Sequence, residues 1–218
     1  MARGLFITFE GGEACGKSTQ VRLLAETLRS AGHIVRELRE PGGTPLGEKL
    51  RHLLKHDPDG HGMAPETELL LMNASRAELV RRVILPALEN GEIVLCDRFY
   101  DSTTAYQAGG RGLDAEAVGA VIGLAVAGTR PDLTLLIRVP RPEALRRLAA
   151  RNLATAPLPD RFEAEQDAFF GRVDAAYDKL AEDGTGRVRV VDGTGSPHEI
   201  ALRVRSEVEA LMARSATA

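Results

Sequence analysis

Five short apolar runs recur along the chain, and longer stretches with a different periodicity separate them. The runs cover residues 5–9, 34–39, 93–96, 133–139 and 188–191. Short runs rich in Val, Ile, Leu and Phe are typical of buried strands. The pattern therefore predicts five strands.

The stretches between the runs carry apolar residues at helical spacing. In residues 17–31, Val21, Leu24 and Leu28 follow that spacing, and Gly32 ends the segment. Further helices are predicted at 46–55, 65–90, 114–127, 162–182, from Pro142 to a break at 155–159 (TAPLP), and after Ser196. Strands that alternate with helices predict an α/β fold with a mainly parallel sheet and helices on both faces.

Local signals refine the helix boundaries. Pro86 is expected to kink its helix or to start a new segment. Asp114 is expected to be an N-cap, and Ser196 with Glu199 forms a capping box. Residues 151–161 are rich in Pro, Ala and Arg, which is a composition that suits a lid.

Composition limits the classes of protein that fit. A length of 218 residues is enough for one α/β domain, and the net charge of -3 gives no general attraction to nucleic acid or to anionic membranes. No apolar stretch approaches the roughly 20 residues of a membrane span. The two cysteines, Cys15 and Cys96, lack metal-ligand spacing and favour a reducing compartment. We therefore expect a soluble cytoplasmic protein that binds neither nucleic acid nor membrane.

The strongest chemical signal is the stretch FEGGEACGKST at residues 9–19, between the first strand and the first helix. It contains Gly11-x-x-x-x-Gly16-Lys17-Ser18, a phosphate-binding loop. Glycines let backbone N–H groups approach phosphate oxygens, and the N-terminus of the following helix favours anions. Lysine can reach the β- and γ-phosphates, and the serine hydroxyl can ligate Mg²⁺.

Other polar clusters are expected at the same edge of the sheet, where loops after parallel strands converge. Asp97 ends the third strand, at a position suited to Mg²⁺. The other clusters are residues 39–44 (REPGGT), residues 97–112 (DRFYDSTTAYQAGGRG), and the arginines Arg146, Arg147, Arg151 and Arg161. Lid arginines could exclude water and neutralise charge in the transition state.

Together these residues resemble the bacterial type of the thymidylate kinase family, over nearly the whole chain from Phe6 to the final helix. The matching parts are FEGGEACGKST, REPGGT, the arginine of NASR at 73–76, DRFYDSTTAYQ at 97–107, GGRG at 109–112, RPDLT at 130–134 and DRFE at 160–163. The resemblance implies a P-loop NTPase fold with a five-stranded parallel sheet in the order 2-3-1-4-5. It implies one domain, 1–218, with a lid at about 147–163. It further implies Mg²⁺-dependent phosphoryl transfer from ATP to dTMP and a homodimer.

The resemblance also implies roles for individual residues. The ATP site would comprise Gly11, Gly12, Glu13, Ala14, Cys15, Gly16, Lys17, Ser18 and Thr19. The dTMP site would comprise Glu13, Arg39, Met72, Arg76, Arg98, Thr103, Tyr106 and Gln107. Catalysis would depend on Glu13, Lys17, Arg98, Arg151 and Arg161. The metal would lie near Ser18, Asp97 and Glu163, with Asp97 alternatively on the acceptor side.

Two positions depart from the commonest family pattern. One subtype has an arginine in the loop next to the position of Glu13, whereas this chain has Ala14, so the charge should come from the lid. The family commonly stacks a phenylalanine on thymine where this chain has Met72, whose thioether can still cover a ring.

Two alternative functions are compatible with parts of the sequence. The same fold could phosphorylate a deoxynucleoside or another monophosphate. A GTP-binding switch should contain Asn-Lys-x-Asp for guanine, and the sequence has no Asn-Lys pair. Its Asp-x-x-Gly at residues 57–60 follows a predicted helix instead of a strand. The motifs therefore favour the kinase.

Overall fold

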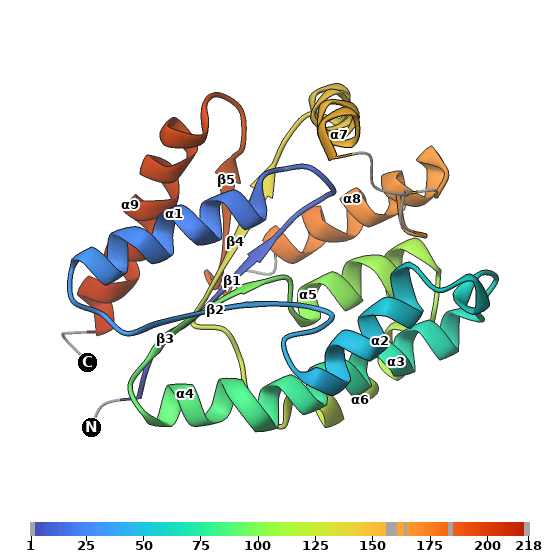
Figure 1. The fold of residues 1–218 in the computed structure, drawn as a ribbon, viewed down its shortest axis with the longest axis horizontal. Helices are drawn as coiled ribbons and strands as arrows, with labels where there is room; N and C mark the ends of the chain where they lie inside the picture. The colour runs from blue at the N-terminus through green and yellow to red at the C-terminus, as the bar shows by residue number, and fades with distance from the viewer. Residues whose placement is uncertain (1–2, 156–160, 164, 183–184, 216–218) are drawn as a thin grey trace.

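A computed structural model describes residues 3–155, 161–163, 165–182 and 185–215. In this part of the chain the strands form one five-stranded sheet in which every pairing is parallel (Figure 1). The strands are β1 (Phe6–Glu10), β2 (Val35–Arg39), β3 (Ile93–Asp97), β4 (Leu133–Arg138) and β5 (Val188–Asp192). Their order, β2-β3-β1-β4-β5, confirms the predicted fold class.

Helices connect successive strands, and most of them match the predicted positions. The α-helices are α1 (Lys17–Ser30), α2 (Pro45–Lys55), α3 (Pro65–Leu79), α4 (Leu85–Glu89), α5 (Tyr100–Thr103), α6 (Ala115–Val126), α7 (Arg141–Thr155), α8 (Asp167–Ala181) and α9 (Pro197–Ser215). A 3₁₀ turn η1 (Pro58–Gly60) and two π-helical segments, η2 (Val80–Ile84) and η3 (Thr104–Gly110), complete them. None of the helices in the described residues is long and apolar enough to cross a membrane.

The sheet separates two apolar layers. Helices α1 and α9 cover one face, where Ile7 and Phe9 of β1 pack in a core with α9 residues such as Val204. Helices α3, α4 and α6 cover the other face, around Phe6 and Phe99 (Figure 1). Alternate residues of β1 therefore serve opposite layers, as the twofold side-chain period of a strand requires.

Two capping predictions are confirmed. The side chain of Asp114 accepts a hydrogen bond from the backbone N–H of Ala117, at 2.9 Å. Ser196 and Glu199 form a reciprocal box: the Ser196 N–H donates to the Glu199 carboxylate at 2.7 Å, and the Glu199 N–H donates to Ser196 Oγ at 3.3 Å. These bonds satisfy donors at the first turns of α6 and α9.

Three segments differ from the prediction. Pro86 does start a new segment, but the π-helical η2 precedes it and keeps the chain helical from α3 to α4. Residues 97–112, for which the sequence pattern predicted no helix, are largely helical through α5 and η3. The helix predicted from Phe162 begins only at Asp167. The extended backbone of Gln166 prevents the helix from reaching further toward the N-terminus. Within the predicted lid and its TAPLP break, residues 156–160 lie outside the described residues.

Helix α8 lies directly against η3, and side chains of α8 reach the η3 backbone at two glycines. A Cβ atom added to Gly109 would lie 2.7 Å from Ala176 Cβ, and one added to Gly110 would lie 2.5 Å from Phe169 Cε2. Both distances are too short for normal packing. Glycine at these positions therefore allows α8 to pack tightly on the segment that carries Tyr106 and Gln107.

Candidate active site

The carboxyl ends of the central strands open on a cavity of about 850 Å³. Ligands of open α/β sheets bind at this edge. Its wall includes most of the predicted site residues: Glu13, Ala14, Gly16, Lys17, Ser18, Thr19, Arg39, Met72, Arg76, Asp97, Arg98, Thr103, Tyr106, Gln107, Arg151 and Glu163. Gly11, Gly12, Cys15 and Arg161 are absent from that wall. The fold thus brings together side chains that are scattered along the sequence.

The glycine loop wraps around the ammonium group of Lys17. Lys17 Nζ donates to the carbonyl oxygens of Gly12, at 2.7 Å, and Gly11, at 3.2 Å. Gly16 forms the N-cap of α1 with φ of 101°, a conformation that favours glycine. A Cβ on Gly11 would meet the Ile137 carbonyl oxygen at 2.4 Å, so this glycine also permits the loop to lie against β4. The loop, lysine and helix N-terminus form an anion-binding arrangement.

Ser18 and Asp97 meet at the mouth of the cavity. Strand β3 pairs with β1 so that Asp97 lies opposite Phe9, directly before the loop. The Ser18 hydroxyl donates to Asp97 Oδ2 at 2.5 Å. The third predicted metal residue, Glu163, lines the same cavity, but its carboxylate accepts a 2.5 Å hydrogen bond from Arg151. The structure therefore joins two of the three predicted oxygen ligands to each other.

Glu13 forms an ion pair with Arg98 beneath the loop. Arg98 Nη2 donates to Glu13 Oε1 at 2.6 Å, and Nη1 donates to the Gly11 carbonyl oxygen at 3.0 Å. Burial raises the pKa of Glu13, but the positive charges of Arg98 and Lys17 outweigh it and lower that pKa to about 2. Glu13 is therefore an ionised carboxylate on the cavity wall.

Arg98 itself is held in an unusual backbone conformation. Its φ of 69° is in the left-handed region, where non-glycine residues are uncommon. Its guanidinium lies 5.0 Å from the centre of the Tyr106 ring and donates to the Tyr106 hydroxyl at 3.2 Å. The strained backbone is consistent with a functional position, since strain of this kind clusters at active sites.

A buried carboxylate that we did not predict supports this pair. Glu10, at the end of β1, accepts hydrogen bonds from the Phe99 N–H and the Tyr177 hydroxyl, each at 2.8 Å, and from the Ser102 hydroxyl at 2.5 Å. Ser102 and the Tyr177 hydroxyl also accept from Arg98. In the sequence, Glu10 is notable only as a charged residue at the end of an apolar strand. Its partners lie far away in the chain, at residues 99–102 and in α8, so no local pattern points to them.

Arg76 anchors the opposite part of the wall and is almost completely buried. It pairs with Glu40 at 2.7 Å, and its Nη1 donates to Asn73 at 2.7 Å and to Thr103 at 2.9 Å. Burial raises the pKa of Glu40 to about 7 despite the opposing charge of Arg76. Gln107, another residue of the predicted dTMP site, lies on the same wall.

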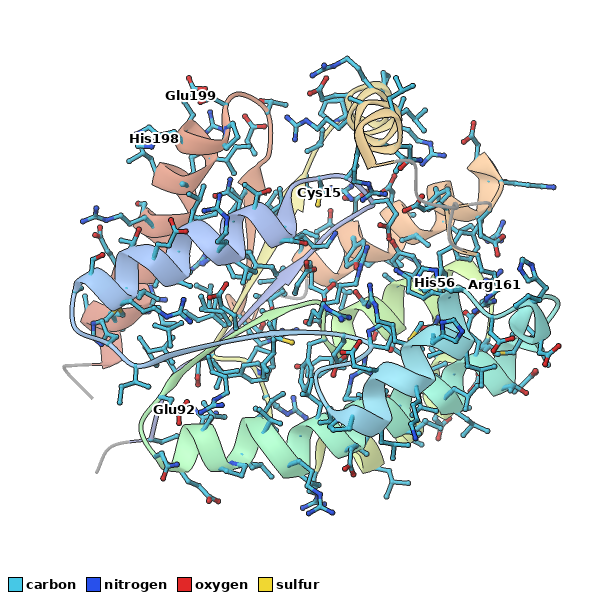
Figure 2. All side chains as sticks on the ribbon, in the orientation of Figure 1. Cys15, His56, Glu92, Arg161, His198 and Glu199 are labelled. Carbon is cyan, nitrogen blue, oxygen red and sulfur yellow. The ribbon has the colours of Figure 1, made fainter. Side chains whose placement is uncertain are left out.

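The lid arginines are divided between two locations. Arg151 lines the cavity together with Arg146 and Arg147 of α7. Arg161 instead pairs with Glu68 at 2.6 Å and donates to the Leu54 carbonyl oxygen at 3.0 Å. Figure 2 shows Arg161 beside His56, near the end of α2. The structure thus groups Arg151, but not Arg161, with the phosphate-binding loop.

Two cations of α2 also line the cavity and were not predicted. Arg51 Nη1 donates to the Pro41 carbonyl oxygen at 2.9 Å, and Lys55 lies one turn later. Arg39, which was predicted, pairs with Glu48 at 2.8 Å. The four-residue spacing of Arg51 and Lys55, in the predicted helix that follows REPGGT, was the signal that could have identified them.

Comparison with known proteins agrees with this geometry. A family model described as "Thymidylate kinase" matches residues 9–204. The chain belongs to the thymidylate kinase family. This membership confirms the resemblance drawn from the order and spacing of the motifs.

Individual members of the family are similar over almost their whole length. A thymidylate kinase of Bordetella pertussis (strain Tohama I) is 47% identical over 215 residues, which cover 98% of this chain and 99% of that protein. One of Gluconobacter oxydans (strain 621H) is 48% identical over 208 residues, 94% of each chain. The crystal structure of thymidylate kinase from Ehrlichia chaffeensis matches with a TM-score of 0.74 at 31% identity, covering 95% of this chain and 99% of the other.

Proposed function

We propose that the protein transfers the γ-phosphoryl group of ATP to dTMP. An oxygen of the dTMP phosphate attacks the γ-phosphorus, the bond to the β,γ-bridging oxygen breaks, and the products are dTDP and ADP. The attacking oxygen is already ionised, so no general base is needed. Membership of the thymidylate kinase family supports this reaction.

One observation carries the proposal: the carboxylate of Glu13, in the phosphate-binding loop, pairs with Arg98 at the end of β3. The loop that surrounds Lys17 and the wall that contains Arg76 and Gln107 line a single cavity. The Glu13–Arg98 pair joins the two parts. Two nucleotides can therefore bind with their phosphates adjacent, and such positioning is the main contribution that a kinase makes.

On the donor side, residues 11–19 would bind ATP. Backbone N–H groups and the N-terminus of α1 would hold the phosphates, and Lys17 would exchange its bonds to the Gly11 and Gly12 carbonyl oxygens for phosphate oxygens. This exchange is favourable because a charged acceptor replaces a neutral one.

Mg²⁺ would be held by Ser18 and Asp97. Mg²⁺ prefers hard oxygen ligands, and the hydrogen bond between these side chains brings a hydroxyl and a carboxylate together beside the loop. When bound, the ion neutralises charge on the β- and γ-phosphates. Glu163 is a further candidate that the lid would contribute, in exchange for its present bond to Arg151.

On the acceptor side, Arg98, Arg39 and the newly identified Arg51 would hold the phosphate of dTMP. The ionised Glu13 would accept a hydrogen bond from the 3′-hydroxyl of the sugar, beside Tyr106. The base would lie among the following side chains of the same cavity wall: Met72, Arg76, Thr103 and Gln107.

The lid, at about 147–163, would supply the catalytic positive charge within a single domain. Of the two arginines first considered, we now assign this role to Arg151, supported by Arg146 and Arg147, because these line the cavity. Arg161 would anchor the returning end of the lid through Glu68 and Leu54.

The test is an ADP-release assay with a panel of nucleoside and deoxynucleoside monophosphates. We expect the highest kcat/KM with dTMP and negligible ADP release without an acceptor. A preference for a ribonucleotide, or acceptor-independent hydrolysis, would overturn the proposal. Lys17→Ala is the control that shows the activity belongs to this loop.

We further propose a homodimer in the cytoplasm. Leu70 of α3 and Leu124 of α6 are 57% and 83% exposed, and these helices pack side by side. Exposed leucines on two neighbouring helices suit contact with a second copy of the chain. Light scattering after size-exclusion chromatography should give twice the chain mass, and Leu124→Glu should shift it to the monomer. A monomer for the unaltered protein would contradict the assignment.

A further inference from the structure

Glu68 of α3 is fully buried just outside the substrate cavity, and three side chains converge on it. Gln107 Nε2 donates to its Oε1 at 2.8 Å. Arg111 donates to both oxygens, at 3.1 and 2.9 Å, and Arg161 pairs with Oε2 at 2.6 Å. A carboxylate is rarely buried so completely, and it is tolerated here because its charge is paired and hydrogen-bonded.

The two arginines keep this carboxylate ionised and fixed in place. Burial raises the pKa of Glu68, but hydrogen bonds from Arg111 and Gln107 and the charges of Arg111 and Arg161 outweigh it, so the pKa is lowered. Arg111 is itself restrained by Glu165, at 2.5 Å, and by the ring of Phe169, 4.7 Å away. An ionised carboxylate has no proton to donate, so it can only accept.

This acceptor determines which way the Gln107 amide faces. A glutamine side chain has a donating NH₂ at one end and an accepting carbonyl at the other, and the two ends have nearly the same shape. Against a neutral partner either orientation could form a hydrogen bond. Against Glu68 only the NH₂ end can, so the carbonyl oxygen must occupy the other end of the amide. Gln107 is 2% exposed and lines the cavity beside Thr103 and Arg76.

We propose that Glu68 is a positioning residue for base selection, which fixes the amide orientation of Gln107 and so sets the hydrogen-bonding pattern offered to the acceptor base. Glu68 does not line the cavity and acts through Gln107. Thymine and cytosine carry opposite patterns at the edge that differs between them. Ring N3 of thymine carries an N–H that can donate to the fixed Gln107 carbonyl oxygen, whereas N3 of cytosine is unprotonated and can only accept. A fixed amide distinguishes these edges, whereas a freely reorienting amide does not.

This inference rests on the proposed function, and Glu68→Gln tests it. The substitution keeps the size of the side chain and adds a donor, so the Gln107 amide can face either way. We expect the ratio of kcat/KM for dTMP to that for dCMP to fall on the order of tenfold, mainly through a higher KM for dTMP. The KM for ATP should stay unchanged, because Glu68 touches no residue of the donor loop.

Glu165→Gln is the matched control. It removes a different carboxylate from Arg111 without touching Gln107, so the dTMP:dCMP ratio should match that of the unaltered protein. The second arm is Glu68→Asp, which keeps an acceptor-only group. Glu68→Asp should retain the thymine preference even if thermal unfolding shows reduced stability. If Glu68→Gln does not fold, the dTMP:dCMP ratio of Glu68→Asp still tests the inference.

A double-mutant cycle separates positioning from general support of the fold. In a Gln107→Met background, Glu68→Gln should cause no further change in the dTMP:dCMP ratio, because the residue through which it acts is gone. An unchanged ratio in Glu68→Gln, loss of preference in Glu68→Asp, or additive effects in the cycle would overturn this inference. Absence of a dTMP preference in the unaltered protein would instead overturn the proposed function.

Discussion

The Arg98 guanidinium donates a 2.6 Å hydrogen bond to the Glu13 carboxylate, which connects the end of the third strand to the phosphate-binding loop. The two residues are 85 positions apart in the chain. Because both side chains are largely shielded from solvent, the removal of one leaves an uncompensated charge.

The first prediction concerns the pH dependence of this pair. The pKa of Glu13 is lowered from its ordinary value of 4.5 to about 2, so folding favours the ionised form. The stability from the pair is thus complete above about pH 5 and is lost as the pH falls toward 2. Glu13→Gln should lower the free energy of unfolding by on the order of 2 kcal/mol at pH 7. The difference from the unaltered protein should shrink below pH 5 in urea titrations; a difference that grows on acidification would contradict this account.

The second prediction separates the two lid arginines. Arg151→Ala removes a cation from the cavity wall and should lower kcat on the order of 100-fold with little change in thermal stability. Arg161→Ala leaves buried Glu68 short of one partner and should mainly lower the unfolding temperature. Steady-state kinetics and calorimetry on both variants check this contrast. The reverse assignment of effects would place the catalytic charge at Arg161.

The third prediction concerns the metal. Chelation of Mg²⁺ should abolish ADP release, and re-addition should restore it. Asp97→Asn should raise the Mg²⁺ concentration needed for half-maximal rate about tenfold, because an amide is a weaker ligand than a carboxylate. Glu92→Gln is the control, since Glu92 lies far from the loop and pairs with Arg36 (Figure 2). Equal Mg²⁺ requirements in Asp97→Asn and the unaltered protein would remove Asp97 from the site.

The fourth prediction concerns the contact between α8 and η3. A methyl group at Gly110 would lie 2.5 Å from the Phe169 ring, so Gly110→Ala should destabilise the protein by about 1–3 kcal/mol. Gly119 of α6 has nothing within 4 Å of the added carbon. Gly119→Ala should therefore stabilise by about 0.5–1 kcal/mol through helix propensity. Urea unfolding of the two variants should give opposite signs, and a neutral Gly110→Ala would contradict the tight packing.

The sequence was most informative where structure depends on neighbouring residues. Apolar runs located all five strands to within about one residue. The phosphate-binding loop at residues 9–19 and the helix caps at Asp114 and Ser196 were predicted because each depends on a few neighbouring residues. The strand order came from the family resemblance. The end of β3 brought Asp97 to Ser18 as expected, because parallel strands share one carboxyl edge.

Features that depend on distant partners were not predictable. The hydrogen bonds of Glu10 come from residues 89 to 167 positions away, and no local pattern identifies such partners. The same holds for Arg161, whose partner Glu68 is buried on another helix. The π-helical turn of η2 was also missed, since a single extra residue in a turn leaves the apolar spacing almost unchanged. The segment η3 was missed because its polar residues and glycines gave no helical pattern.

The close packing of α8 on η3 has a consequence for how the enzyme opens and closes. Because Gly109 and Gly110 have no side chains, side chains of α8 lie directly against the η3 backbone, and we expect α8 to move together with the turn that carries Gln107. On this expectation, the side of the cavity that could move to admit nucleotides is the one lined by the arginines of α7. The wall beside Gln107 would then keep its shape during turnover, and base selection and nucleotide release would depend on different helices.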